Sequence, residues 1–265
     1  MTATLNTTAF TEEWTRWHEE REAALRAPLG WLSLTGLHWL TDSPEHLDGV
    51  PGTWWVTDEK VFITAQPADR LVFDGELVAG VSILTPVEGA PGLLVDNDGR
   101  QLEVIRRSGQ FAVRVHDSAA ATLRDFTGVV AYPADPRWVV TGNFTPFETE
   151  RTVTTGAVVA GLEHHHRAQG TIEFTLKGQR LSLVAFGTPA ELRVLFTDAT
   201  SGVTTYPAAR VLTVGAVAED GTVELDFNRA VNLPCAFTDY ATCPVAPAEN
   251  RLSVAVEAGE QDPRR

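Results

Sequence analysis

The chain has 265 residues, of which 43% are hydrophobic and 21% charged, as is typical of a folded protein able to bury its own core. Its 35 acidic and 21 basic residues give a formal net charge of −14, which repels nucleic-acid phosphates and anionic membrane surfaces. We therefore expect no nucleic acid and no membrane partner, and instead a small molecule or another protein.

The N-terminal sequence MTATLNTTAFTEEW shows neither the basic region nor the apolar region of a signal peptide. No run of about 18 apolar residues is present that would predict a membrane-spanning helix. The two cysteines do not make a disulfide framework. Together these features predict a cytoplasmic location.

One helix is predicted, within residues 1–30. Phe10, Trp14 and Trp17 recur near one face at helical spacing, with charged residues elsewhere around the helix, and Pro28 and Gly30 end the pattern. Such an apolar face either packs on the sheet of its own chain or serves as an interaction surface, for example in a homodimer.

From Trp31 onwards, segments that alternate apolar and polar residues dominate the chain. Tight-turn pairs such as Asp74-Gly75 and Lys177-Gly178 separate many of them, and no helices alternate with them. This pattern predicts an all-β fold, mainly an antiparallel barrel or sandwich of about a dozen strands, with an N-terminal α-helix. The predicted strands cover residues 54–57, 60–64, 70–73, 102–107, 111–116, 137–144, 151–159, 171–176, 181–186, 192–197, 210–217 and 222–227.

Residues 31–260 are predicted to form one β-rich domain, followed by a flexible tail over residues 261–265. A composition shift at residues 131–136 (AYPADP) could divide it into two subdomains, although neither half shows an internal repeat.

The alternation of apolar and polar residues stops after Phe227, and residues 228–252 show almost no periodicity. Loops of this length are usually functional or disordered, and Cys235, Phe237 and Tyr240 favour an ordered loop because such residues seek burial. Residues 252–259 (LSVAVEAG) then alternate again and predict a strand. The segment from Asp226 to Glu260 is therefore the candidate functional stretch.

The motif D-F-N-R-A-x-N-x-P-C at residues 226–235, with the later C-P and E-N-x-L, resembles the family called domain of unknown function 1684. The resemblance extends from about Trp14 to Glu260. The family pattern N-P-P-C is changed here, because Leu233 replaces the first proline before Pro234 and Cys235. The name of this family states that no activity is assigned to it, so the chemistry has to come from the residues themselves.

Arg229 is the leading candidate for ligand binding, since its guanidinium offers a fixed fork of donors for an anion. Asp226 and Asn228 share a strand face beside it, and Asn232 follows in the loop. The alternative is that Arg229 pairs with Asp226 or Glu249 to hold the loop, while the asparagines bond its backbone. In the functional interpretation Asp226 handles protons and the asparagines orient the substrate.

Cys235 and Cys243 are most simply small buried hydrophobic residues. Cys235 could also be a nucleophile or redox residue activated by a nearby arginine, or both cysteines could join a metal site. His164 and His166 would share a strand face and could chelate a metal, but an exposed cluster is the simpler interpretation. The sequence identifies no cofactor.

Further candidates come from the same half of the chain. Arg210 and Tyr206 are four residues apart on a predicted strand and could join Arg229 around a ligand. Glu257 could act as a general base or face solvent. Tyr240, Glu249 and Asn250 complete the candidate ligand-binding set.

No nucleophile elbow, P-loop, dinucleotide-binding glycine pattern or zinc-protease motif is present in the sequence. The preferred hypothesis is an enzyme or enzyme-like polar pocket that acts on a small polar or anionic molecule. A β-barrel that binds a ligand without catalysis, or a structural module that forms homodimers, are the alternatives.

Overall fold

The computed structural model describes residues 7–265, so the first six residues of the predicted N-terminal region lie outside the described part. The chain forms two compact units. Unit 1 comprises Met1–Glu22, Gly128–Phe237 and Thr242–Arg265, and unit 2 comprises Ala23–Thr127 and Thr238–Ala241. The chain passes between them at Gly128, next to the composition shift at residues 131–136.

Unit 2 contains two antiparallel sheets around one hydrophobic core, in which Trp54, Ile63, Leu71 and Leu102 are fully buried. The six-stranded sheet has the order β1 (Leu34–Trp39), β9 (Gln110–Asp117), β8 (Arg100–Arg107), β7 (Leu93–Asn97), β4 (Val72–Phe73) and β5 (Glu76–Leu77). The three-stranded sheet has the order β2 (Thr53–Thr57), β3 (Lys60–Ala65) and β6 (Gly80–Leu84), and a short helix α2 (Ala121–Arg124) follows β9.

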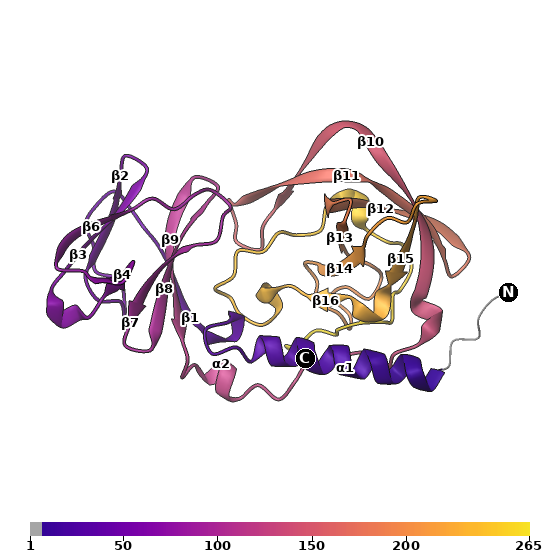
Figure 1. Cartoon of the computed structure of the whole chain (residues 1–265), viewed down its shortest axis with the longest axis horizontal. Coiled ribbons are helices and arrows are strands. Elements are labelled where there is room, and N and C mark those ends of the chain that lie inside the picture. Colours follow the sequence, from indigo (N-terminus) through magenta and orange to yellow (C-terminus); the bar gives the residue numbers. More distant parts are fainter. Residues whose placement is uncertain (1–6) are drawn as a thin grey trace. The chain divides into compact units, whose positions relative to one another are not determined.

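Unit 1 is built on one antiparallel sheet of seven strands, joined by most of the N-terminal helix α1 (Thr7–Leu25) (Figure 1). The sheet has the order β15 (Thr222–Asp226), β10 (Val139–Gly156), β11 (Glu163–Leu176), β12 (Gln179–Thr188), β13 (Glu191–Phe196), β14 (Arg210–Gly215) and β16 (Val231–Asn232). The predicted antiparallel β class with an N-terminal helix is confirmed. The described strands form three sheets and no closed barrel.

The predicted tight turns occur where the sequence places them. Asp74-Gly75 joins β4 to β5, and Lys177-Gly178 joins β11 to β12, with positive φ angles at all four residues. This left-handed backbone suits the twist of adjacent antiparallel strands, which explains why such pairs signal hairpins.

Two predicted strands, over residues 137–144 and 151–159, are wrong as separate elements, because β10 is one strand from Val139 to Gly156. The pairing of β10 with β11 shifts register between Pro146 and Arg151. Proline has no backbone N–H to donate to the ladder, so the strand bulges there and then resumes.

The strand predicted at residues 252–259 is also wrong, since this segment has no regular structure. Leu252, Val254 and Val256 do alternate into the unit 1 core, as the pattern indicates. However, the Val256 N–H donates to the Asp198 carboxylate at 3.1 Å rather than to a neighbouring strand. The alternation therefore reports which side chains are buried and not how the backbone is paired.

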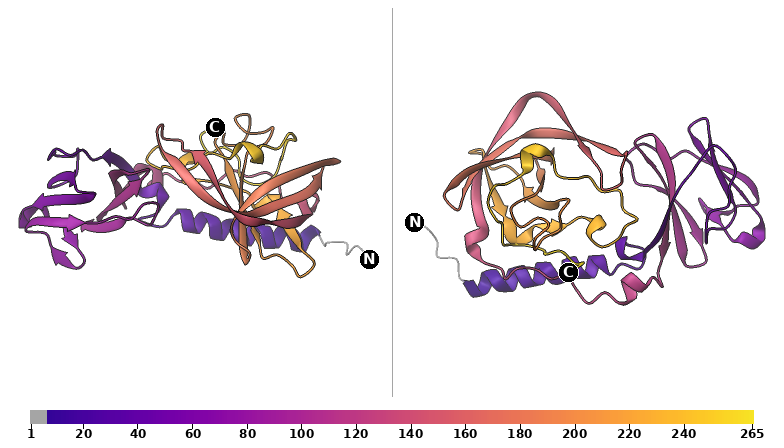
Figure 2. Two further views of the ribbon diagram at one scale, coloured as in Figure 1. Left: turned by 90° about the horizontal axis from the view of Figure 1, so that it is seen from above. Right: turned by 180° about the vertical axis from the view of Figure 1, so that it is seen from behind.

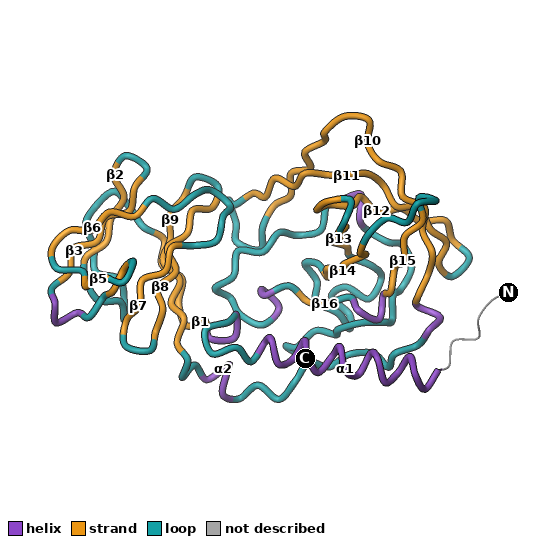
Figure 3. Tube along the Cα trace, in the orientation of Figure 1, coloured by secondary structure: helices purple, strands orange, loops and turns teal. Residues whose placement is uncertain are grey.

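The C-terminal segment of unit 1 packs against the seven-stranded sheet, since Leu252, Val254 and Val256 share one hydrophobic core with the sheet residues (Figures 1 and 2). It consists mostly of loops and short 3-10 turns after β16 (Figure 3). In the described residues, no helix is both long and apolar enough to cross a membrane.

Candidate functional site

A cavity of about 620 Å³ lies between α1 and the strands β14, β15 and β16 of unit 1, and we call it the Arg229 pocket. Its walls combine apolar, acidic and basic side chains. The apolar lining includes Phe10, Trp17, Val139, Val214 and Val231, and the charged lining consists of Glu13, Arg21, Glu224, Asp226 and Arg229.

Arg229 is presented by a 3-10 turn, Phe227–Arg229, that follows directly on β15. Asp226, the last residue of β15, starts this turn because its carboxylate accepts a hydrogen bond from the Asn228 N–H at 3.1 Å. The same carboxylate lies 3.1 Å from the Arg229 Nε. Because that nitrogen has no hydrogen-bond partner of good geometry, this second contact is electrostatic.

On its other side, Arg229 donates from Nη2 to the Glu13 carboxylate of α1 at 2.6 Å, and its guanidinium lies 5.6 Å from the Trp17 ring centre. The Arg229 side chain is 34% exposed and Glu13 is 66% exposed, whereas Asp226 is only 14% exposed. Arg229 is therefore anchored on one carboxylate and paired at the surface with another that solvent or a ligand can replace.

The second arginine of the pocket, Arg21, is held in place. It donates to the Glu260 carboxylate at 3.0 Å and to the Asn232 carbonyl at 3.1 Å. Glu260 is 1% exposed and also accepts the Asn232 N–H at 2.6 Å. Gly259 brings Glu260 to this position, since its φ of +76° and its close approach to Ala230 leave no room for a side chain.

The predicted ligand-binding asparagines hold backbone segments together. Asn228 accepts from the Asp135 N–H at 2.9 Å and donates to the Asp135 carbonyl at 3.0 Å. Asn250 is fully buried and makes three hydrogen bonds to the backbones of Val184 and Leu195, on β12 and β13. Asn232 donates to the Gln261 carbonyl at 2.7 Å. None of the three lines the Arg229 pocket.

Arg210 does not lie beside Arg229. It is 1% exposed and donates to the Asp198 carboxylate at 2.8 Å, to the Val256 carbonyl at 3.0 Å and to the Ala258 carbonyl. Burial lowers the pKa of Arg210, and the neighbouring Asp198 opposes that effect. Arg210 thus ties the C-terminal segment to the sheet from inside the core.

The candidate catalytic residues lie in three separate places. Asp226 lines the Arg229 pocket, and Cys235 is buried next to Cys243, whose sulfur accepts the Cys235 N–H at 3.3 Å. Glu257 is exposed and pairs with Lys177 at 3.4 Å, in a hollow of about 390 Å³ beside Trp138.

Three other candidates also lie away from the pocket. Tyr206 lies near Cys235, and burial together with this neighbour raises the pKa of the Tyr206 hydroxyl. Glu249 pairs with Arg151 at 2.5 Å on the surface, and not with Arg229. Tyr240 belongs to unit 2, where its N–H donates to the Thr238 hydroxyl.

The histidine cluster lies on β11. His164 and His166 share one face, with ring centres 6.0 Å apart. The His164 Nε2 donates to the Thr242 carbonyl at 2.6 Å, and the His166 Nε2 shares a hydrogen bond with the Thr155 hydroxyl at 3.1 Å. Burial, reinforced by the neighbouring imidazoles, lowers the pKa of His166. Within residues 7–265, no group of three His, Cys, Asp or Glu side chains is placed to hold a metal ion.

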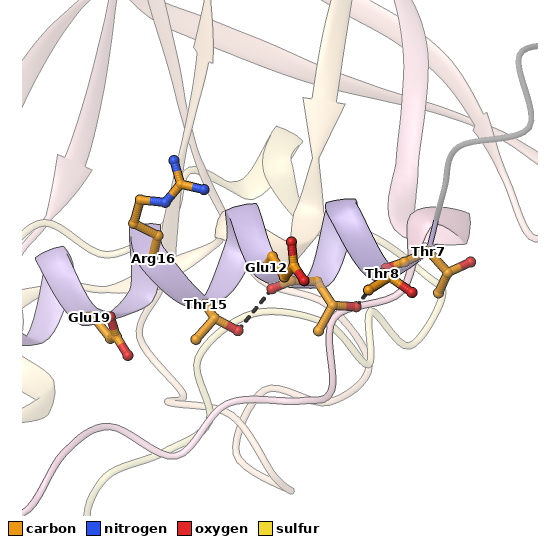
Figure 4. Close-up of a pocket in the computed structure, with 7 residues that line it drawn as sticks. Thr7, Thr8, Glu12, Thr15, Arg16 and Glu19 are labelled. Carbon is orange, nitrogen blue, oxygen red and sulfur yellow. Dashed lines mark hydrogen bonds between the residues drawn. The ribbon is translucent and has the colours of Figure 1, made fainter.

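Another hollow, of about 600 Å³, is lined among the described residues only by α1 itself, including Thr8, Glu12, Arg16 and Glu19 (Figure 4). The Thr11 and Thr15 hydroxyls donate to carbonyls one turn earlier. Because one helix supplies all of the described side chains that line this hollow, we assign no site there.

Glu13, Trp17, Arg21 and Glu224 were not predicted as site residues. The first three, with Phe10, occupy positions i, i+3, i+7 and i+11 of one helical stripe, which is a signal available in the sequence. Glu224 and Asp226 are two residues apart on β15 and so share one face. The sequence does not show that this stripe of α1 faces β15.

Residues 124–261 match the family described as protein of unknown function (DUF1684). The chain belongs to this family. Its C-terminal signature, at residues 226–235, forms the turn that carries Arg229 and the loop that leads to Cys235. The family resemblance seen in the sequence is therefore confirmed for residues 124–261, while its extension towards Trp14 stays a prediction.

The chain is also similar to an uncharacterized protein of Haloarcula marismortui whose structure was solved by solution NMR, with 30% sequence identity and a TM-score of 0.44. The match covers 52% of this chain and 78% of that protein. No curated protein matches the chain.

Proposed function

We propose that unit 1 binds a small polar molecule in the Arg229 pocket, with Arg229 as the residue that recognises an anionic group. The observation that carries this proposal is the asymmetric setting of Arg229 between a nearly buried Asp226 and an exposed Glu13. A ligand carboxylate that displaces Glu13 replaces one surface ion pair with another that is less exposed. Because Asp226 already holds Arg229 in position, little side-chain entropy is lost when the ligand binds.

The remaining charges of the pocket favour a ligand that also carries a cationic or hydrogen-bond-donating group. Glu224 lines the same cavity, and among the described residues its carboxylate has no hydrogen bond or ion pair. Asp226 is next to it on the strand face. A purely anionic ligand would meet these two carboxylates, whereas a zwitterion has a partner for each side of the pocket.

The apolar wall formed by Phe10, Val139 and Val231 adds a third requirement, a short hydrocarbon part. An α-amino acid meets all three conditions. Both Asp226 oxygens are engaged, one by Asn228 and one by Arg229, which suits a positioning role better than proton transfer. We therefore favour binding over catalysis at this pocket.

Three probes that share an isobutyl group test this proposal by calorimetric titration: leucine, 4-methylpentanoate, which lacks the amine, and 3-methylbutylamine, which lacks the carboxylate. We expect leucine to bind more tightly than either of the others. Arg229→Gln should weaken leucine binding by about tenfold or more, because a charge-assisted hydrogen bond is lost. Glu224→Gln should weaken only the two probes that carry an amine.

Arg180→Gln is the matched control, since this arginine is 89% exposed on β12 and lies outside the Arg229 pocket. Its leucine affinity should equal that of the wild type. If none of the three probes binds at about 10 mM, or if Arg229→Gln and Arg180→Gln bind leucine equally, the proposal is overturned.

A further inference from the structure

The two cysteines of the chain lie side by side in unit 1, away from the Arg229 pocket. The Cys235 N–H donates to the Cys243 sulfur at 3.3 Å, which places the second sulfur directly beside Cys235. The Tyr206 side chain is close enough to Cys235 to influence the pKa of its thiol. A thiol pair with a phenol beside it is more than the two separate buried hydrophobic residues that the sequence alone suggests.

We propose that Cys235 and Cys243 form a peroxide-sensitive thiol pair, in which Cys235 is oxidised first and Cys243 then closes an intramolecular disulfide. This proposal is independent of the ligand-binding function proposed for the Arg229 pocket.

The backbone holds both cysteines in place. Cys235 lies in the 3-10 turn Pro234–Ala236, whose closing hydrogen bond from Phe237 to Pro234 is 2.9 Å long. Cys243 is fixed by the Val158 N–H, which donates to its carbonyl at 2.9 Å. Residues 237–242 between them have no strand or helix and can absorb the small adjustment that a sulfur–sulfur bond requires.

Three neighbouring groups act on the Cys235 thiol. Hydrogen bonds from Cys243 and Tyr206 lower the pKa of Cys235 although burial works against this, and Arg264 adds a favourable charge. Burial and the adjacent Cys235 raise the pKa of Tyr206, so its hydroxyl stays protonated and able to donate. The thiolate is the reactive form of cysteine, so the lowered pKa favours Cys235 as the attacking sulfur.

Access restricts the oxidant to small molecules. Cys235 is 2% exposed and Cys243 7%, and Arg264 donates to the carbonyls of Cys235 and Ala236, both at 2.8 Å. A hydroperoxide as small as hydrogen peroxide can reach sulfur in such a place more readily than a protein disulfide can. Once Cys235 is oxidised, the nearest thiol is Cys243 and not one from another molecule.

The reaction balances with hydrogen peroxide as the oxidant. The Cys235 thiolate attacks one peroxide oxygen, so that a sulfur–oxygen bond forms, the oxygen–oxygen bond breaks and hydroxide leaves to be protonated to water. The Cys243 thiol then displaces the hydroxyl of the Cys235 sulfenic acid, which forms the disulfide and releases a second water. Two thiols and one peroxide give one disulfide and two waters.

The experiment uses the full chain, reduced, freed of reductant, exposed to hydrogen peroxide and then alkylated before intact-mass measurement. Because the chain has only two cysteines, an intramolecular disulfide can only join Cys235 to Cys243. We expect a monomer that loses about 2 Da and takes up no alkyl group, and a dithiol reductant should restore both alkylations. Two alkylations after peroxide, or a disulfide found only between chains, would overturn the proposal.

Single variants test the order of the two steps. Cys243→Ser should accumulate a sulfenic acid at Cys235, detected as a dimedone adduct, whereas Cys235→Ser should form little adduct under the same exposure. Equal labelling of the two variants contradicts the assignment of Cys235 as the attacking sulfur. Circular dichroism establishes that each variant is folded. If Cys243→Ser does not fold, Cys243→Ala takes its place.

Discussion

Arg210 and Arg229 of unit 1 each lie close to an aspartate and over an aromatic ring, yet they are placed very differently. Arg210 faces Asp198 and Phe196 with 1% of its surface exposed, while Arg229 faces Asp226 and Trp17 with 34% exposed. Arg210 also donates to three backbone carbonyls of the C-terminal segment. Burial therefore separates an arginine that holds the fold from one that can meet a ligand.

The largest effect that this comparison predicts is on Arg210. Replacing Arg210 by Met leaves the Asp198 carboxylate, which is 0% exposed, without its partner. We expect the free energy of unfolding to fall by about 3–5 kcal/mol, measured by urea denaturation. Arg193→Met, which breaks the exposed pair with Glu191, is the control and should cost less than about 1 kcal/mol. Equal losses in the two variants would contradict the distinction.

Unit 2 offers a second buried network, in which the Glu103 carboxylate lies 3.2 Å from Arg114 and 3.4 Å from His116. Burial by itself raises the pKa of Glu103, but hydrogen bonds from His116 and Arg114 and the Arg114 charge lower it from 4.5 to about 2. Because the folded pKa lies below the unfolded one, the stabilisation is present above pH 4.5 and is lost as the pH falls towards 2.

This shift corresponds to roughly 3 kcal/mol of stability at neutral pH, since each pKa unit is worth about 1.4 kcal/mol. Urea denaturation as a function of pH should show this loss in the wild type. Glu103→Gln should be less stable than the wild type at pH 7 and should lose less stability over the same acid range. A variant with an unchanged acid profile would mean that Glu103 does not carry the effect.

The next smaller effect concerns Asn250, which bonds to backbone groups of Val184 and Leu195. In Asn250→Ala these buried groups lose their partners, so we expect a loss of about 1–3 kcal/mol. Hydrogen exchange at the Val184 amide should accelerate in parallel. Asn143→Ala, at an exposed position of β10, should change neither quantity appreciably. An unaltered Val184 exchange rate would show that this asparagine does not hold β12.

The sequence predicts much of this fold because the signals for hairpins are local. Lys177-Gly178 adopts the left-handed backbone that a two-residue turn needs, and the residues on either side alternate as strands do. The strand predicted at residues 252–259 fails for a physical reason. Alternation reports the burial of Val254 and Val256, while the backbone partners are the Asp198 side chain and the loop after β13, both distant in sequence.

The candidate site is predictable only in part. Asp226 and Arg229 stand together in the sequence and in the pocket, but Glu13 and Trp17 come from a helix more than 200 residues away. Asn228, Asn250 and Arg210 have the residue types of a binding site, and only their burial shows that they serve as internal supports. Many polar side chains in an irregular segment do not by themselves indicate a binding site, because such a segment also needs them as hydrogen-bond partners for its own backbone.

A ligand can replace Glu13 as the ion-pair partner of Arg229. The loss of Arg229 should therefore affect ligand binding more than it affects stability. The most direct test is the shift of the urea midpoint caused by leucine, in the wild type and in Arg229→Gln. Without ligand, the free energy of unfolding of the variant should lie within about 1 kcal/mol of that of the wild type. With leucine, the variant should not show the stabilisation that the wild type gains. A variant that is destabilised as much as Arg210→Met, or that leucine stabilises as much as the wild type, would contradict the account.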